Sequence, residues 1–407
     1  MELPKELSKT SSFRALIDNN CVYVDKTDII AKFAVKKGPF VFFRPRGFGK
    51  SLLVSTLYEL FKNGVESFCG LKIKDLWKDK TYKVIKIDFS RFKESSSTDS
   101  FKASFNQELF TALKNANLSL NKVQDNDVPS DLLSEVLMNI NSTDLVLLID
   151  NYDAPLTAVL GDKAEFASRR KILSNFYSTV KSYQGVFRFV FITGEINYFS
   201  SSTFSSFNHL EDLSFNSDYG ALLGFTEDDL EHYFSLYTDR ACEVLNKLNK
   251  NRQYTHDNLL STLKSKYGDY CFDNKAKEHI YNPSFIVNFF SELKEEHTYR
   301  HISERFRNSN LENFLRQALS KDIKEQLQRS LDLDTTIYLA QANLYPQLDS
   351  LTERDLYAIL YQLGYLCIKA SRKGMLSFGI PNLAVKHALK ELIKDIENRA
   401  GKSALDG

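Results

Sequence analysis

The sequence is poor in cysteine and histidine, carries no excess of either charge, and contains no long apolar run. Its 407 residues include five cysteines and seven histidines, and neither set has the short spacings of a zinc site. The first residues lack the apolar stretch of a signal peptide, and no segment approaches the roughly 18 apolar residues of a membrane helix. These absences predict reduced thiols, a cytoplasmic location and no membrane insertion.

Charge and apolar content point to an ordinary globular protein. There are 53 basic and 52 acidic residues, so the net charge is +1, which gives no sign of a nucleic-acid-binding surface. Hydrophobic residues make up 43% of the chain, enough for a sizeable core. The length suggests two or three domains.

The first half alternates short apolar runs with longer helical patterns. The runs over 40–43, 83–90, 144–150 and 187–193 are rich in β-branched and aromatic residues, and the last two are apolar enough to be buried on both faces. Helical patterns cover 51–61, 100–116 and 164–183. This alternation predicts an α/β domain with a parallel sheet over residues 1–222.

The second half is mostly helical. Segments 226–250, 256–268, 283–297 and 302–330 have helical periodicity, which predicts a helical, lid-like region over 223–345. A helix from 355 to 363, two short strands separated by Ser-Arg-Lys-Gly, and a lysine-rich final helix predict a C-terminal helix and β-hairpin region over 346–407. Its layout is similar to that of a winged helix.

The segment from residue 44 to residue 52, RPRGFGKSL, ends like a phosphate-binding P-loop, G-x-x-x-x-G-K-[ST]. An apolar run precedes it and a helical pattern follows, as a P-loop requires, but Arg44 stands where the first glycine is expected. In such a loop Lys50 reaches the β- and γ-phosphates and Ser51 holds Mg²⁺. The predicted nucleotide-binding residues are Arg44, Arg46, Gly47, Phe48, Gly49, Lys50, Ser51 and Leu52.

A second motif supports this site. The run LVLLID ends in Asp150, as does a Walker B strand, whose aspartate supports the bound Mg²⁺. The interval from Lys50 to Asp150 leaves room for a strand inserted between the two motifs. Ser51 and Asp150 are therefore the predicted metal-site residues.

The residue after Asp150 is Asn151, where such ATPases usually have a glutamate that activates water. An amide cannot accept that proton, so the expected activity is ATP binding with slow or no hydrolysis. Asp153 follows two residues later, and Glu195 follows the next predicted strand and is therefore expected at the same sheet edge, so either could replace it. Asn151, Asp153 and Glu195 are thus the candidate catalytic positions.

With these motifs, the chain resembles the AAA-ATPase-like domain of bacterial proteins that often carry a C-terminal PD-(D/E)XK nuclease-type domain. The similar segments run in family order from residue 13 to about 390 and include FRALIDNNCVYVDKT, FRPRGFGKSLLVSTL, LLIDNYDAPL, FVFITGEINYFS and YNPSFIVNFF. The resemblance implies that Arg-Pro-Arg is a family variant of the loop, and that the nuclease-type domain would begin just after residue 382. The sequence is too short to hold that domain, so no nuclease activity is expected. Two short patterns, Glu292-Leu293-Lys294 and Asp322-Ile323-Lys324, fit solvated helix faces better than a nuclease site.

The sequence therefore predicts an ATP- and Mg²⁺-binding P-loop module of the inserted-strand type that acts as a nucleotide-dependent switch or regulator. One alternative is an active ATPase that uses Asp153 or Glu195. The other is a protein-interaction scaffold whose nucleotide site has decayed. The expected partners are nucleotide and either another protein or a second copy of the chain, and nothing in the sequence supports binding to nucleic acid.

Overall fold

The structure is a computed structural model that describes residues 5–92, 95–119, 127–198, 210–248, 253–294, 337–340 and 353–403. The predicted helix over 302–330, and with it the pattern at 322–324, lies outside these ranges. Among the described residues, no helix is both long enough and apolar enough to cross a membrane.

The first half folds around a five-stranded parallel sheet, as predicted. Its strand order is β2-β3-β4-β1-β5. The strand that leads into the P-loop, β1, is separated by β4 from β3, which ends in Asp150. This is the inserted-strand arrangement expected from the spacing of the two motifs. The bounds are β1 Gly38–Phe43, β2 Lys83–Asp88, β3 Leu145–Asp150, β4 Phe187–Gly194 and β5 Glu211–Asp212.

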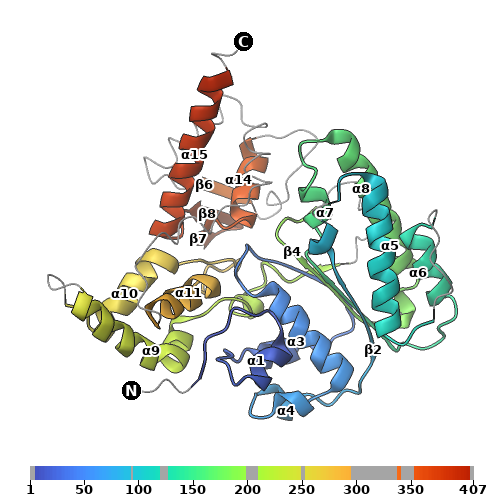
Figure 1. Ribbon diagram of the computed structural model, residues 1–407, viewed down its shortest axis with the longest axis horizontal. Helices are drawn as coiled ribbons and strands as arrows, with labels where there is room; N and C mark the ends of the chain where they lie inside the picture. Colours follow the sequence, from blue (N-terminus) through green and yellow to red (C-terminus); the bar gives the residue numbers. More distant parts are fainter. Residues whose placement is uncertain are drawn as a thin grey trace.

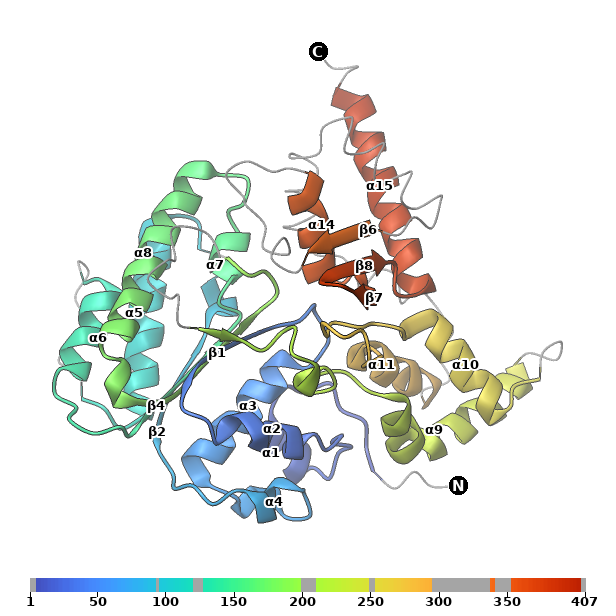
Figure 2. The ribbon, with the colours of Figure 1, turned by 180° about the vertical axis from the view of Figure 1, so that it is seen from behind.

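Helices cover both faces of this sheet (Figures 1 and 2). On one face, Phe61 of α3 and Phe33 of α2 both pack against Phe189 of β4. On the other face, Phe105 of α5 packs against Phe176 of α8. Every residue of β3 and β4 is buried, which explains their nearly continuous apolar sequences. The helices are α1 Phe13–Asp18, α2 Thr27–Ala34, α3 Lys50–Asn63, α4 Ile73–Leu76, α5 Thr98–Asn115, α6 Pro129–Leu137, α7 Ala154–Thr157 and α8 Lys163–Ser182.

The next region is a group of three helices with a hydrophobic core of its own. They are α9 Glu227–Leu248, α10 His256–Tyr267 and α11 Pro283–Lys294. Phe234 of α9 stacks on Phe290 of α11, and Leu259 and Leu263 of α10 complete the cluster. Glu292 lies in α11, so the pattern at 292–294 is helical, as predicted.

The C-terminal region contains α14 Glu353–Gln362, the hairpin β7 Cys367–Arg372 and β8 Met375–Gly379, and α15 Leu383–Ser403. Lys373 and Gly374 both have positive φ, as a two-residue hairpin turn requires. A third strand that the sequence analysis missed, β6 Ile337–Ala340, pairs with β8. Tyr361 of α14 stacks on Phe215, which follows β5, so this region and the sheet share one hydrophobic core.

Candidate functional site

The P-loop lies between the end of β1 and the start of α3. Gly47 and Gly49 have φ values of +86° and +94°, which residues with a side chain rarely adopt. α3 begins at Lys50, and the first N–H groups of a helix have no acceptor within it. The loop and the first turn of α3 therefore offer backbone donors and the positive end of a helix at one place.

Lys50 spans the loop from inside. Its Nζ donates to the carbonyl oxygens of Arg44 and Pro45, both at 2.9 Å. Burial lowers the pKa of Lys50, while the charges of Glu195, Asp153 and Asp150 act in the opposite direction. An ammonium group held at the glycine loop can pair with a phosphate, whose negative charge offsets the cost of burying the lysine.

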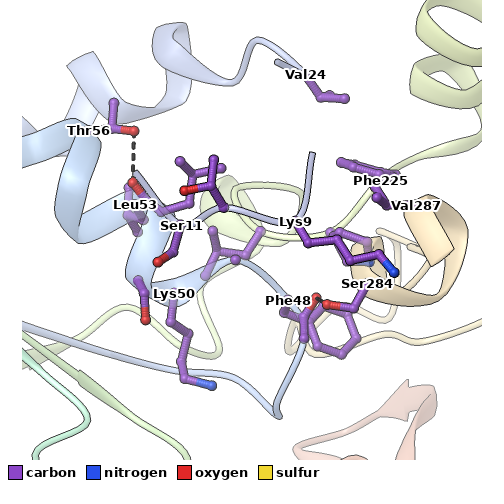
Figure 3. Close-up of a pocket in the computed structure, with 18 of the residues that line it drawn as sticks. Lys9, Ser11, Val24, Phe48, Lys50, Leu53, Thr56, Phe225, Ser284 and Val287 are labelled. Atoms are coloured by element: carbon purple, nitrogen blue, oxygen red, sulfur yellow. Dashed lines mark hydrogen bonds between the residues drawn. The ribbon is translucent and has the colours of Figure 1, made fainter. Parts of the chain in front are cut away.

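A pocket of about 410 Å³ opens in front of the loop (Figure 3). Lys50 and Ser51 line this pocket, and so do the apolar side chains of Val24, Phe225 and Val287. The lining comes from the N-terminal segment, the P-loop, residues 222–225 and α11, which are far apart in the sequence. A lining that combines the P-loop with apolar side chains fits a ligand that joins phosphates to a planar base.

Asp150, at the end of β3, lies near Ser51 of the pocket lining. Burial raises the pKa of Asp150, and the nearby Ser51 hydroxyl acts in the opposite direction. Among the described residues, nothing donates to Asp150 Oδ1, although that atom is buried. An orphaned carboxylate oxygen beside a hydroxyl fits Mg²⁺, which needs one or two protein ligands when phosphate and water supply the rest.

Asn151 lines the pocket but is fixed by a neighbouring strand. Its backbone has a φ of +52°, and its Nδ2 donates to Asp88 Oδ1, at the end of β2, over 3.0 Å. Asp88 pairs with Asp150 in the sheet register, so the ends of β2 and β3 bring these three side chains to one edge. Asp88 had no predicted role, although it ends an apolar run in the same way as Asp150.

The two other candidate carboxylates differ in position. Asp153 is buried and accepts from the backbone N–H groups of Glu195 and Ile196, at 3.1 and 3.0 Å. Burial and the charge of Glu195 raise the pKa of Asp153 to about 6. Asp153 is absent from the pocket lining and holds the turn after β4, whereas Glu195 lines the pocket. The geometry thus favours Glu195 over Asp153 as a group that faces a ligand.

The two loop arginines also differ. The guanidinium of Arg44 is buried between the rings of Phe42 and Phe272, and Nη1 donates to the carbonyls of Phe43 and Ser214 at 2.9 and 2.8 Å. The phosphate contact expected from Arg44 is not what the structure shows, because its side chain points into the core behind the loop. Arg46 does line the pocket, with its side chain 59% exposed and Nε 3.9 Å from Glu195 Oε1.

Phe48 was predicted as a nucleotide-binding residue, but its packing partners were not, and Asn282 and Ser284 were missed altogether. Phe48 is buried and packs edge-on against Tyr270 and Phe272, so it anchors the loop to the segment after α10. Asn282 and Ser284, at the start of α11, bond to the loop's carbonyls. Both lie in the family-like segment YNPSFIVNFF, which is the only sequence signal that pointed to them.

The strand order and the loop together define a P-loop ATPase-like α/β domain with an inserted strand. Residues 9–204 match a family model described as a predicted AAA-ATPase, which confirms the resemblance over this part of the chain.

Individual proteins are also similar to the chain. An uncharacterized protein in the vnfD 5'region of Azotobacter chroococcum mcd 1 is 28% identical over 283 residues. The alignment covers 67% of this chain and 53% of the relative, so the chain spans about half the relative's length. A solved structure of Drosophila ORC bound to GC-rich DNA and Cdc6 covers 74% of this chain and 42% of its own, at 10% identity and a TM-score of 0.30. That likeness is too low to transfer any property.

Proposed function

We propose that this chain binds ATP together with Mg²⁺ and acts as a switch or regulator that responds to nucleotide occupancy. The observation that carries the proposal is the convergence of Lys50, Ser51 and Asp150 beside the glycine loop and the pocket. ATP and Mg²⁺ are the ligands that AAA-type ATPase domains generally use, and the donors described above suit both.

Each residue has a distinct role in this proposal. Backbone N–H groups from Gly47 to Ser51 donate to phosphate oxygens, and Lys50 turns from the carbonyls of Arg44 and Pro45 toward the phosphates. Ser51 and Asp150 hold the metal, which neutralises charge on the phosphates when it is bound. Arg46 adds a charge-assisted contact at the open side of the pocket.

Slow hydrolysis is part of the proposal. Asn151 faces the pocket at the position from which a glutamate would take a proton, and an amide cannot take it. General-base assistance contributes on the order of 10²–10⁴-fold, so its loss leaves a slow reaction. A protein that binds ATP and seldom cleaves it suits control by occupancy.

The strongest alternative is an active ATPase with Glu195 as the base. Its support is that Glu195 lines the same pocket as Asn151 and Lys50. In that case Glu195→Gln abolishes phosphate release and leaves ATP affinity nearly unchanged. On the slow-hydrolysis proposal, the same substitution has little effect on an already low rate.

Calorimetric titration with ATP and Mg²⁺ tests the binding. We expect saturable binding to the wild type and none to Lys50→Ala. Lys62→Ala, at the other end of α3, is the matched control and binds as the wild type does. Equal binding by wild type and Lys50→Ala contradicts the proposed site, and no binding by the wild type favours the scaffold with a decayed site.

We also propose that the domain limits lie at residues 222 and 345 and that the last region is similar to a winged helix. The same proposal includes a cytoplasmic location and a partner that is another protein or a second copy of this chain. The support for a separate helical region is the core of α9, α10 and α11, whose cluster differs from that of the sheet.

A further inference from the structure

The outer side of the P-loop is held by the start of α11, more than 230 residues away in the sequence. Asn282 Nδ2 donates to the carbonyl of Arg46 over 3.0 Å. The backbone N–H and the hydroxyl of Ser284 both donate to the carbonyl of Gly47, over 3.2 and 3.1 Å. Asn282 Oδ1 in turn accepts from the Ser284 N–H, so the pair forms one connected network.

These bonds complete a pattern along the loop. Lys50 occupies the carbonyls of Arg44 and Pro45, and Asn282 and Ser284 occupy those of Arg46 and Gly47. Four consecutive carbonyl groups are thus fixed by side chains. Fixing the carbonyls fixes the peptide planes, and with them the direction of the N–H groups that would meet phosphate.

The contact is also very close. A Cβ atom at Gly47 would lie 2.7 Å from Asn282 Oδ1 and 3.1 Å from Ser284 Oγ. Pro283 and Ser284 line the pocket as well, so the start of α11 touches both the loop and the space that the ligand would fill. A shift of α11 therefore cannot leave the loop unchanged.

We propose that Asn282 and Ser284 are positioning residues for phosphate binding, and that they couple the helical group α9–α11 to nucleotide occupancy. This inference rests on the proposed function, because it assigns the part of the chain that responds to ATP. Coupling between two sites is reciprocal. If α11 orders the phosphate loop, ATP on the loop must in return stabilise the start of α11.

The substitutions Asn282→Ser and Ser284→Ala test the positioning role by calorimetry. A serine at 282 can still cap α11, since serine is a good N-cap residue, but it is too short to reach the Arg46 carbonyl. A neutral hydrogen bond contributes roughly 1 kcal/mol, so ATP affinity should fall about fivefold in each variant. Ser284→Thr keeps the hydroxyl and should bind ATP as the wild type does.

Two comparisons separate positioning from a general structural effect. Adenosine lacks phosphates, so its affinity for the pocket should be the same in the wild type and in both variants. Thr262→Ala is the control, because its hydroxyl donates to the Asn258 carbonyl within α10. Hydrogen exchange at the start of α11 should slow on addition of ATP and Mg²⁺ in the wild type, and slow less in Asn282→Ser.

The outcomes are distinct. If the wild type binds no ATP, the proposed function fails and this inference fails with it. If the wild type binds ATP and both variants bind it equally well, only the positioning role is overturned. An equal loss of ATP and adenosine affinity also overturns it, because the residues then shape the pocket without acting on phosphate.

Discussion

The side chain of Asn151 is bonded to Asp88: Nδ2 of the amide donates to Oδ1 of the carboxylate over 3.0 Å. A carboxylate oxygen accepts, so the amide must turn its nitrogen toward β2 and its oxygen away from it. In this orientation Asn151 can hold a water molecule through its oxygen, but it cannot deprotonate that water. A substitution at position 151 therefore also removes or changes a hydrogen-bond partner of Asp88.

The first prediction is that the amide at position 151 and the carboxylate at position 88 can be exchanged without loss of the hydrogen bond between them. Asn151→Glu alone places a carboxylate against Asp88 and close to Asp150, and such repulsion raises carboxyl pKa values and weakens the metal site. The double variant Asp88→Asn with Asn151→Glu reverses donor and acceptor and keeps the bond. We expect it to release phosphate at least tenfold faster than the wild type, with similar ATP affinity, because a general base is restored.

Asp88→Asn alone is the control for this pair and should show no gain, since it supplies no carboxylate at 151. A wild type that hydrolyses ATP as fast as the double variant would argue against the assignment. Loss of that wild-type rate in Glu195→Gln would make Glu195 the base instead.

The second prediction separates the two loop arginines. Arg44 is 1% exposed and bonded to backbone carbonyls, so Arg44→Ala should leave a cavity and lower the free energy of unfolding by on the order of 2–5 kcal/mol. Arg46→Ala should change stability by less than about 0.5 kcal/mol, because the side chain is largely exposed. Chemical denaturation of the two variants measures both effects.

ATP titration of the same two proteins provides the other half of this comparison. Arg46→Ala should bind ATP roughly tenfold more weakly, since a charge-assisted contact to phosphate is lost. Unchanged ATP affinity in Arg46→Ala would remove Arg46 from the site. A stable Arg44→Ala protein would show that the guanidinium is not needed in the core.

The third prediction concerns pH and the packing of α9 on α10. His256 of α10 lies between two carboxylates of α9: its Nδ1 is 2.6 Å from Asp239 Oδ1, and its Nε2 is 3.2 Å from Glu231 Oε2. The hydrogen bond to Asp239 raises the pKa of His256. Protonation is therefore favoured in the folded state. The stabilisation is complete below the unfolded histidine pKa of about 6.5 and is lost as pH rises through the higher folded value.

His256→Gln should accordingly lower the unfolding midpoint at pH 5.5 and have a smaller effect at pH 8.5. His279→Gln is the matched control, because His279 is more exposed and its nearest carboxylate, on Asp269, lies 3.5 Å away. An equal loss at both pH values would show that the charge on His256 does not link the helices.

Much of the fold was predictable from the pattern of apolar residues within short stretches of the sequence. The four main strands were predictable because each is a run of apolar residues buried on the sheet, and the order of P-loop and Asp150 indicated the inserted strand. β5 was not predictable, since it is only Glu211–Asp212 and has no apolar signature. β6 stands in sequence that otherwise reads as helical, and it is a strand because it pairs with β8.

The site was predictable only where its residues are neighbours in the sequence. Lys50, Ser51 and Asp150 follow from two local motifs. The burial of Arg44 depends on Phe272, and the clamp on Gly47 depends on Asn282, both more than 220 residues away. The role of Asn151 likewise depends on the register of β2 with β3, which no single stretch of sequence specifies.

The most direct test follows the fate of ATP on the protein in a single turnover. Wild type is mixed with a slight deficit of ATP and Mg²⁺, free nucleotide is removed, and the ATP and ADP retained are quantified over time. The prediction is that the wild type retains nucleotide mainly as ATP long after binding is complete, while Lys50→Ala retains none. Failure of the wild type to retain nucleotide, or its prompt conversion to ADP, would contradict an ATP-occupied switch.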